Sequence, residues 1–266
     1  MTMNDTFTLG IVQMASTEDI ETNLEAIQAA LKNLQGRCDL AIFPEYSLNF
    51  GTTDVLQRNG KTLAEYDALL APLVRPGDFA CVFGGLPVKT PDGGMHDSML
   101  AFDEDGKLML RYDKMHLFKY TGKKGPAVDE EAVFKRGNSP QSMKIKGWKI
   151  GVSICYDLRF PELYRTYAPA DLMLCTAAFL QATGQAHWSP LIRARAIENQ
   201  CYFAGVNQCS KALYGHSLVC DPWGDVISEA GEQPAIITVT LNKSRIDEIR
   251  ENLSALEHRH PLFGNR

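Results

Sequence analysis

Short runs of apolar and β-branched residues recur along the chain and constrain its fold more than any other feature. Several of these runs are apolar at nearly every position, which is typical of strands that are buried on both faces. They span residues 6–14, 38–44, 79–88, 148–155, 171–178 and 201–208. Strands of this kind lie inside sheets that other elements cover. The chain is therefore predicted to have an α/β fold.

Helical patterns separate the apolar runs. One is a stripe of leucine and isoleucine at helical spacing, made by Leu24, Ile27, Leu31 and Leu34. Thr22 and Glu25 have the spacing of a capping box and predict where this helix begins. A second helix is predicted over residues 188–200, and a short one begins near Ser244. We expect these helices to cover the outer faces of the sheets.

Two segments predict hairpins. Residues 98–112 turn at 104–106, and residues 216–230 turn at 222–224. Hairpins among alternating strands and helices indicate mixed sheets. No linker rich in Pro, Gly or Ser interrupts the pattern, so residues 1–266 are predicted to form a single domain. The longest predicted loop covers roughly residues 119–140, and a loop of this length is usually functional.

Charge and cysteine usage exclude several classes of protein. The chain has 27 basic and 32 acidic residues, so it lacks the basic excess of proteins that bind nucleic acid or acidic membranes. The first residues do not resemble a signal peptide, and no apolar run reaches the roughly 18–20 residues of a membrane span. The 7 scattered cysteines include no C-x-x-C pair. We expect a cytoplasmic protein with reduced thiols and no bound metal.

Three strand-like runs end on groups that could act together in catalysis. The run LAIFPEYSL presents Glu45, LMLRYDKMHLF presents Lys114, and GVSICYD presents Cys155. A thiol can attack an electrophilic carbon, a carboxylate can take its proton, and a cation can stabilise the resulting oxyanion. A carboxylate beside a thiol disfavours the thiolate, so the resting pair should be thiol and carboxylate. Spacing alone leaves open whether the three ends meet or Cys155 is a buried core thiol.

The chain resembles the carbon–nitrogen hydrolases of the nitrilase superfamily. FPEYSL, RYDKMHLF and GVSICYDLRFPE stand in that family's order and spacing. The resemblance implies a four-layer αββα sandwich that pairs into a homodimer or a higher homo-oligomer. It also implies an enzyme that cleaves C–N bonds through a cysteine thioester without a cofactor. Glu45 is then the general base, Lys114 the oxyanion-stabilising cation and Cys155 the nucleophile, and the backbone N–H of Tyr156 completes the oxyanion hole.

Two further residues follow from the resemblance. The family often has a second glutamate between the lysine and the cysteine, and Glu130 fits that place, although Glu131 adjoins it. Residues 184–203 and 214–224 resemble the branch that hydrolyses ω-amides of α-keto acids or deaminated glutathione. These small-molecule amides carry carboxylates, which Arg159 could bind through two parallel hydrogen bonds. Alternatively, Arg159 forms a structural pair with Glu162 or Asp157.

The substrate itself stays open at this point. A nitrilase or an N-carbamoyl amino-acid amidohydrolase would use the same three residues, and a non-catalytic binding protein could keep the same fold. The loop around residues 121–131 and the segment AAFLQATG depart from the branch pattern. The sequence therefore predicts the reaction class more sharply than the compound.

Overall fold

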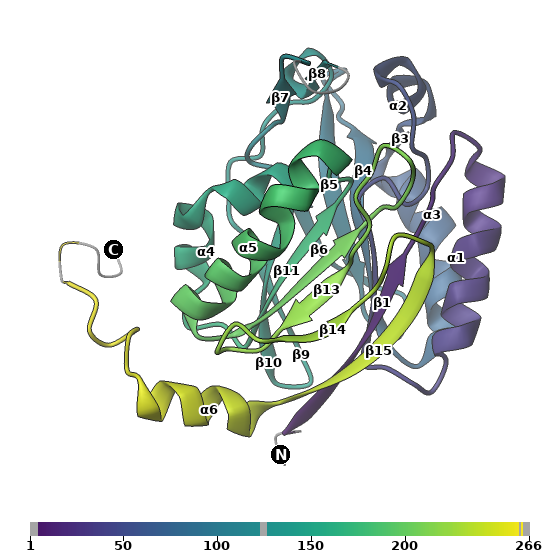
Figure 1. Ribbon diagram of the computed structural model, residues 1–266. Helices are drawn as coiled ribbons and strands as arrows, with labels where there is room; N and C mark the ends of the chain where they lie inside the picture. Colours follow the sequence, from purple (N-terminus) through teal and green to yellow (C-terminus); the bar gives the residue numbers. More distant parts are fainter. Residues whose placement is uncertain (1–4, 123–126, 261, 263–266) are drawn as a thin grey trace.

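The computed structural model describes residues 5–122, 127–260 and 262 of the chain. Figure 1 shows two sheets packed face to face, with helices on their outer sides. The predicted loop at 119–140 and the C-terminal part of the family resemblance, at 258–264, fall partly outside the described residues. No helix within the described part of the chain is long and apolar enough to cross a membrane.

The first sheet contains the N-terminal strands and one strand from the other end of the chain. Its order is β15-β1-β2-β4-β5-β6, and the short β3 pairs with β4. Strands β1, β2 and β4 run parallel, while β5, β6 and β15 join antiparallel. The bounds are β1 Thr6–Gln13, β2 Leu40–Phe43, β3 Lys61–Thr62, β4 Ala80–Lys89, β5 Met95–Phe102, β6 Leu108–Asp113 and β15 Ala235–Asn242.

The second sheet has the order β14-β13-β12-β11-β10-β9. Strands β10, β11 and β12 run parallel, and hairpin partners complete both edges. The bounds are β9 Ser142–Ile145, β10 Trp148–Ile154, β11 Leu172–Ala177, β12 Tyr202–Asn207, β13 Leu218–Cys220 and β14 Val226–Glu229. Both sheets are therefore mixed, as the sequence predicted.

The remaining elements are helices and short pieces between strands. The α-helices are α1 Ile20–Leu34, α2 Thr53–Asn59, α3 Leu63–Val74, α4 Pro161–Tyr167, α5 Gln181–Asn199 and α6 Lys243–Asn252. The 3-10 helices are η1 Arg75–Gly77, η2 Glu130–Ala132 and η3 Cys155–Arg159. The strands β7 Lys119–Tyr120 and β8 Val128–Asp129 form a small separate pair.

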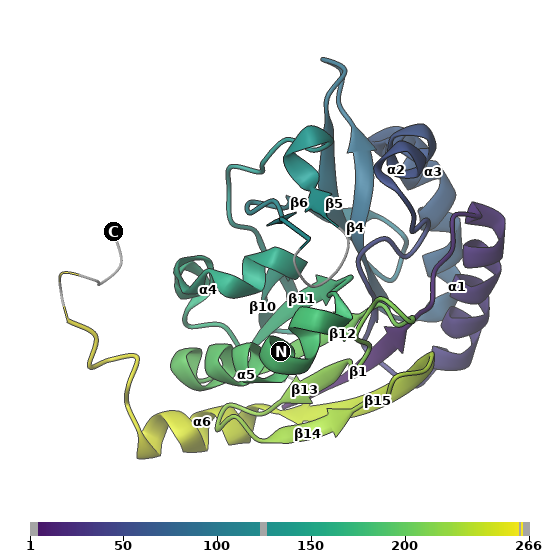
Figure 2. The same ribbon diagram turned by 45° about the horizontal axis from the view of Figure 1, so that its top comes forward.

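Alternating side chains build the layers. In β2, Leu40 and Ile42 face the space between the sheets, while Ala41 and Phe43 pack with the cluster under α1 and α3. Phe7 stacks on Trp148 across the two sheets, with ring centroids 5.4 Å apart. Figure 2 shows α1 and α3 on one outer side and α4 and α5 on the other. The arrangement is the expected four-layer αββα sandwich.

Glycine allows the helices to approach the second sheet closely. A Cβ on Gly151 would lie 2.5 Å from the Tyr167 ring in α4, and one on Gly205 would lie 2.3 Å from Ile192 in α5. Even alanine at either position would push the helix away from the strand. The glycines of GVSICYD and CYFAGVNQ therefore set the spacing between layers.

The six strand-like runs and both hairpins are confirmed, but some predicted boundaries are wrong. The N-cap of α1 is Asp19, whose side chain accepts hydrogen bonds from Glu21 and Thr22, so Thr22 lies inside the helix. Helix α5 begins at Gln181, seven residues before the predicted start, with no side-chain cap to signal it. The predicted loop at 119–140 contains β7, β8 and η2.

Candidate active site

Glu45 lies in a tight turn that follows β2, one residue after Pro44. Tyr46, the next residue, has φ +60°, and its N–H donates to the carbonyl of Gly85 at 2.9 Å. Gly85 has φ +58°, and a Cβ there would lie 2.3 Å from Cγ of Glu45. The glycine therefore provides both the backbone conformation and the space that the glutamate side chain occupies. The Glu45 side chain is 1% exposed.

Lys114 follows β6 and points into the same buried space. Its N–H donates to the Asp97 carbonyl at 2.9 Å, and its carbonyl accepts from the N–H of Gly137 at 2.8 Å. The side chain is fully buried, with Nζ 2.7 Å from Oε1 of Glu45 and 2.8 Å from Oε1 of Glu130. A third carboxyl group, Asp97, lies 3.3 Å from Nζ. Lys114 thus lies at the centre of an acidic cluster, which we define as Glu45, Asp97 and Glu130.

The two glutamates of the acidic cluster are held at both oxygens. Oε2 of Glu45 accepts from the N–H of Ala178 at 2.6 Å, and Oε2 of Glu130 accepts from the N–H of Phe118 at 2.7 Å. The adjacent Glu131 has an exposed side chain that pairs with Arg136 instead. Of the two neighbouring acids, Glu130 is the one that contacts Lys114.

The acidic cluster keeps Lys114 charged. Burial alone would lower the pKa of this lysine, but the nearby carboxyl groups, chiefly those of Glu130 and Glu45, outweigh it and raise the pKa well above its usual range. Oxygens of the three acids lie within 4.8 Å of one another, a spacing that could hold a cation. The Lys114 ammonium already lies among these oxygens.

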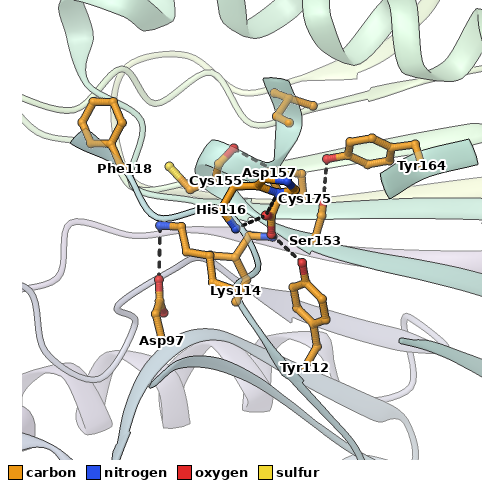
Figure 3. A network of polar contacts seen from close by, with 12 residues as sticks. Asp97, Tyr112, Lys114, His116, Phe118, Ser153, Cys155, Asp157, Tyr164 and Cys175 are labelled. Atoms are coloured by element: carbon orange, nitrogen blue, oxygen red, sulfur yellow. Dashed lines mark hydrogen bonds and ion pairs between the residues drawn. The ribbon is translucent and has the colours of Figure 1, made fainter. Parts of the chain in front are cut away.

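Cys155 begins η3 at the end of β10, with φ +44°. A positive φ is uncommon for a residue with a side chain and directs the thiol out of the line of the strand. Burial, followed by the charge of Glu45, raises the pKa of Cys155 well above its usual range, while Lys114 lowers it. The resting group is therefore the thiol. Figure 3 shows its sulfur and the Lys114 ammonium at the same end of one polar network.

Asp157 connects the turn that carries Cys155 to the segment that carries Lys114. One of its oxygens accepts from the N–H of Ile154 at 3.0 Å and from the hydroxyl of Tyr112 at 2.7 Å. The other accepts from the N–H of His116 at 3.0 Å and lies 2.8 Å from its Nδ1. This fully buried carboxyl, labelled in Figure 3, fixes the two segments relative to each other.

An apolar pocket opens next to these groups. Glu45, Glu130 and Cys155 line it together with aromatic side chains that include Tyr46, Phe118, Phe134 and Phe179. Tyr156 and Arg159, from the turn after the cysteine, also line it. The structure therefore places five of the six predicted site residues on the wall of one pocket, and the sixth, the buried Lys114, contacts two of them, Glu45 and Glu130.

Arg159 contributes a cation to the pocket wall. Its guanidinium lies 5.1 Å from the centre of the Phe179 ring and 5.7 Å from that of Tyr156. Nη1 lies 3.2 Å from Nδ1 of His187. Among the described residues Arg159 has no ion pair with Glu162 or Asp157, so the alternative structural pairing is wrong.

Sequence reasoning missed two residues of this site, Asp97 and Asp157. Asp97 interrupts the apolar strand MHDSMLAF, which is a signal for a buried polar role. Asp157 follows the cysteine closely, and the sequence suggests it only as a partner for Arg159. Both side chains are fully buried, and their partners come from distant parts of the chain.

Comparison with known proteins identifies relatives over nearly the whole chain. Residues 8–251 match the family model described as carbon-nitrogen hydrolase. A deaminated glutathione amidase of Dictyostelium discoideum is 33% identical, with 97% of this chain and 95% of that protein covered. An omega-amidase of Danio rerio is 29% identical, with 95% and 94% covered.

The fold also matches solved structures. Saccharomyces cerevisiae Nit3, described as a member of branch 10 of the nitrilase superfamily, superimposes with a TM-score of 0.87 at 28% identity. The match covers 97% of this chain and 98% of the yeast chain. Both sheets and the helical layers therefore have counterparts in that superfamily.

Proposed function

The chain belongs to the carbon–nitrogen hydrolase family and is an amidase, and we propose that it hydrolyses a small carboxylate-bearing amide with Cys155 as its nucleophile. The observation that carries the proposal is the short contact between Lys114 and Glu45 beside the Cys155 thiol, at the wall of an apolar pocket. General base, cation and nucleophile are the set that acyl transfer requires.

The proposed reaction has two stages. Sγ of Cys155 attacks the amide carbonyl carbon while Glu45 takes the thiol proton. Lys114 and the backbone N–H of Tyr156 stabilise the oxyanion. Glu45 then returns the proton to the leaving nitrogen, so ammonia or an amine departs and a thioester remains. Water attacks this thioester, Glu45 takes the water proton, and the acid leaves as the thiol is restored. Glu130 holds Lys114 in place throughout.

Arg159 supports a substrate that carries a carboxylate. Its guanidinium lies against two aromatic rings at the pocket wall, where water is partly excluded and a charged hydrogen bond gains strength. Relatives named deaminated glutathione amidase and omega-amidase make an ω-amide of this kind the leading candidate. A nitrile or an N-carbamoyl amino acid is the alternative, because the same three groups could process either compound.

We further propose that residues 1–266 form one cytoplasmic domain that needs no metal or cofactor and pairs as a homodimer. Exposed apolar side chains support the pairing: Ile197 of α5 is 49% exposed and Trp223 of the β13–β14 hairpin is 54% exposed. A Cβ on Gly224 would lie 2.5 Å from Ile197, so the hairpin and helix share one apolar surface. Analytical ultracentrifugation of the wild type and Trp223→Asp tests this pairing.

Ammonia release and a trapped adduct test the function. We expect turnover of an ω-amide such as α-ketoglutaramate or of deaminated glutathione, measured against nitriles and N-carbamoyl amino acids. Mass spectrometry of a slow substrate should find the acyl group on Cys155, and Cys155→Ala should abolish turnover while remaining folded. An adduct on another cysteine would refute the mechanism. A lack of turnover with the whole panel, together with no selective labelling of Cys155 by iodoacetamide, would favour a non-catalytic binding protein.

A further inference from the structure

We propose that Asp97 is a neutral carboxylic acid in the resting enzyme and acts as a positioning residue for Lys114 and Glu45. The acidic cluster surrounds one ammonium with three carboxyl groups, so it would carry an excess of two negative charges if all three were ionised. The charge state of Asp97 follows from geometry alone. Its effect on the rate rests on the function proposed above.

The hydrogen bonds that Asp97 accepts differ from those of the two glutamates. Each glutamate has a bond of 2.6–2.8 Å at both oxygens, with the Lys114 ammonium at one and a backbone N–H at the other. Bonds of this length are typical of ionised carboxylates. Asp97 receives only longer contacts at one oxygen, 3.3 Å from Nζ of Lys114 and 3.4 Å from the Tyr46 hydroxyl.

The other oxygen of Asp97 decides its charge. Oδ1 has no hydrogen-bond partner among the described residues, and the Asp97 side chain is fully buried. An ionised carboxylate in that position would have a charged oxygen with neither water nor a donor, which is strongly unfavourable. A proton on Asp97 removes the charge and provides a donor for the neighbouring Glu45.

The surrounding charges act in the same direction. Burial raises the pKa of Asp97 well above its usual range, the carboxyl groups of Glu45 and Glu130 raise it further, and only Lys114 opposes them. Cys155 as a thiol and the buried phenols of Tyr46 and Tyr66 bring no positive charge near it. When carboxyl groups share a buried site, one of them commonly keeps its proton.

A neutral Asp97 preserves the positive electrostatic field of Lys114, which stabilises the oxyanion in the proposed reaction. The Lys114 ammonium donates hydrogen bonds to Glu45 and Glu130, and Asp97 lies 3.3 Å from it as a third, longer contact. A third anion would draw the ammonium away from the developing oxyanion and would repel that oxyanion directly. The acid form keeps the third polar contact with Lys114 in place without adding this repulsion.

Two substitutions at Asp97 distinguish the effect of its charge from that of its polar contact with Lys114. Asparagine keeps the size, an acceptor and a donor, so Asp97→Asn should lower kcat less than about tenfold and leave the pH profile of kcat/KM in place. Leucine removes the polar contact with the Lys114 ammonium, so Asp97→Leu should lower kcat about ten- to hundredfold with little change in KM. A shifted pH profile in Asp97→Asn, or losses as large as in Asp97→Leu, would overturn the proposal.

The charge state of Asp97 can also be measured in the wild type, so that this test does not depend on whether a variant folds. In protein labelled with 13C at the aspartate carboxyls, one signal should keep the chemical shift of a protonated acid up to neutral pH. Asp97→Asn, if folded, should remove that signal. A spectrum in which every aspartate is ionised at neutral pH would refute the assignment, even in an active enzyme. Conversely, a protonated aspartate in a protein that hydrolyses no amide would contradict the proposed function and leave the charge state intact.

Discussion

Glu130 and Glu131 offer a matched pair of substitutions in adjacent residues. Glu130 is buried and accepts from Lys114 at 2.8 Å and from the Phe118 N–H at 2.7 Å. Both partners are donors, so the amide of Glu130→Gln must point its NH₂ group at one of them. The variant loses the charge and at least one hydrogen bond.

The size of the effect follows from that loss. A hydrogen bond to a charged group contributes about 1.5–3 kcal/mol, and about 1.36 kcal/mol corresponds to a factor of ten. Glu130→Gln should therefore lower kcat/KM about ten- to 150-fold, because Lys114 is less firmly placed. Its melting temperature should also fall, since a buried ion pair loses a partner. Rates are measured by ammonia release well below the melting temperatures of both variants.

Glu131→Gln provides the control. The Glu131 side chain is 44% exposed and pairs with an Arg136 side chain that is 59% exposed. Exposed pairs of this kind contribute about 0–1 kcal/mol, so activity and stability should change little. Wild-type activity in Glu130→Gln, or equal losses in both variants, would show that the contact between Glu130 and Lys114 has no part in the reaction.

Three other perturbations test neighbouring features. Arg159→Lys keeps the charge but loses the planar guanidinium that can donate two parallel hydrogen bonds to a carboxylate. The value of kcat/KM should therefore fall about ten- to hundredfold for carboxylate-bearing amides and little for an uncharged amide of similar size. Equal losses on both substrates would show that the role of Arg159 is structural. Gly85→Ala places a Cβ 2.3 Å from Cγ of Glu45 and should lower kcat about 10²-fold, whereas Gly93→Ala, also at positive φ but with no atom within 4 Å, should lose only stability. Finally, burial raises the pKa of Asp97, so the folded protein keeps a proton that the unfolded chain releases above about pH 4. The contribution of Asp97 to the stability of the wild type is therefore lost as pH rises from there. The melting temperature of Asp97→Asn relative to that of the wild type should rise between about pH 4 and pH 7, and a constant difference would contradict this.

The strands and the three reactive groups were predictable because each is signalled locally. Glu45, Lys114 and Cys155 lie at the ends of strand-like runs, and a polar group at a strand end is visible without knowledge of its neighbours. The sequence does not predict the start of α1 correctly, because Asp19 and Thr22 are both acceptable caps and local sequence does not rank them.

Asp97 and Asp157 could not be identified in the same way. The contact of Asp97 with Tyr46 spans 51 residues, and that of Asp157 with Tyr112 spans 45. Their roles depend on which buried donors surround them, and the packing of the two sheets decides this. The choice between Glu130 and Glu131 likewise needed the direction of each side chain, which two adjacent acids in a sequence do not reveal.

The position of the pocket groups on both sheets has a consequence for how activity arises during folding. Glu45, Asp97 and Lys114 come from the first sheet, while Cys155 and the Ala178 N–H that holds Glu45 come from the second. Contacts between residues so far apart along the chain form late, because long loops must close first. Neither sheet alone contains all of these groups. In a refolding experiment, the rate at which activity returns would therefore report the rate at which the two sheets pack together.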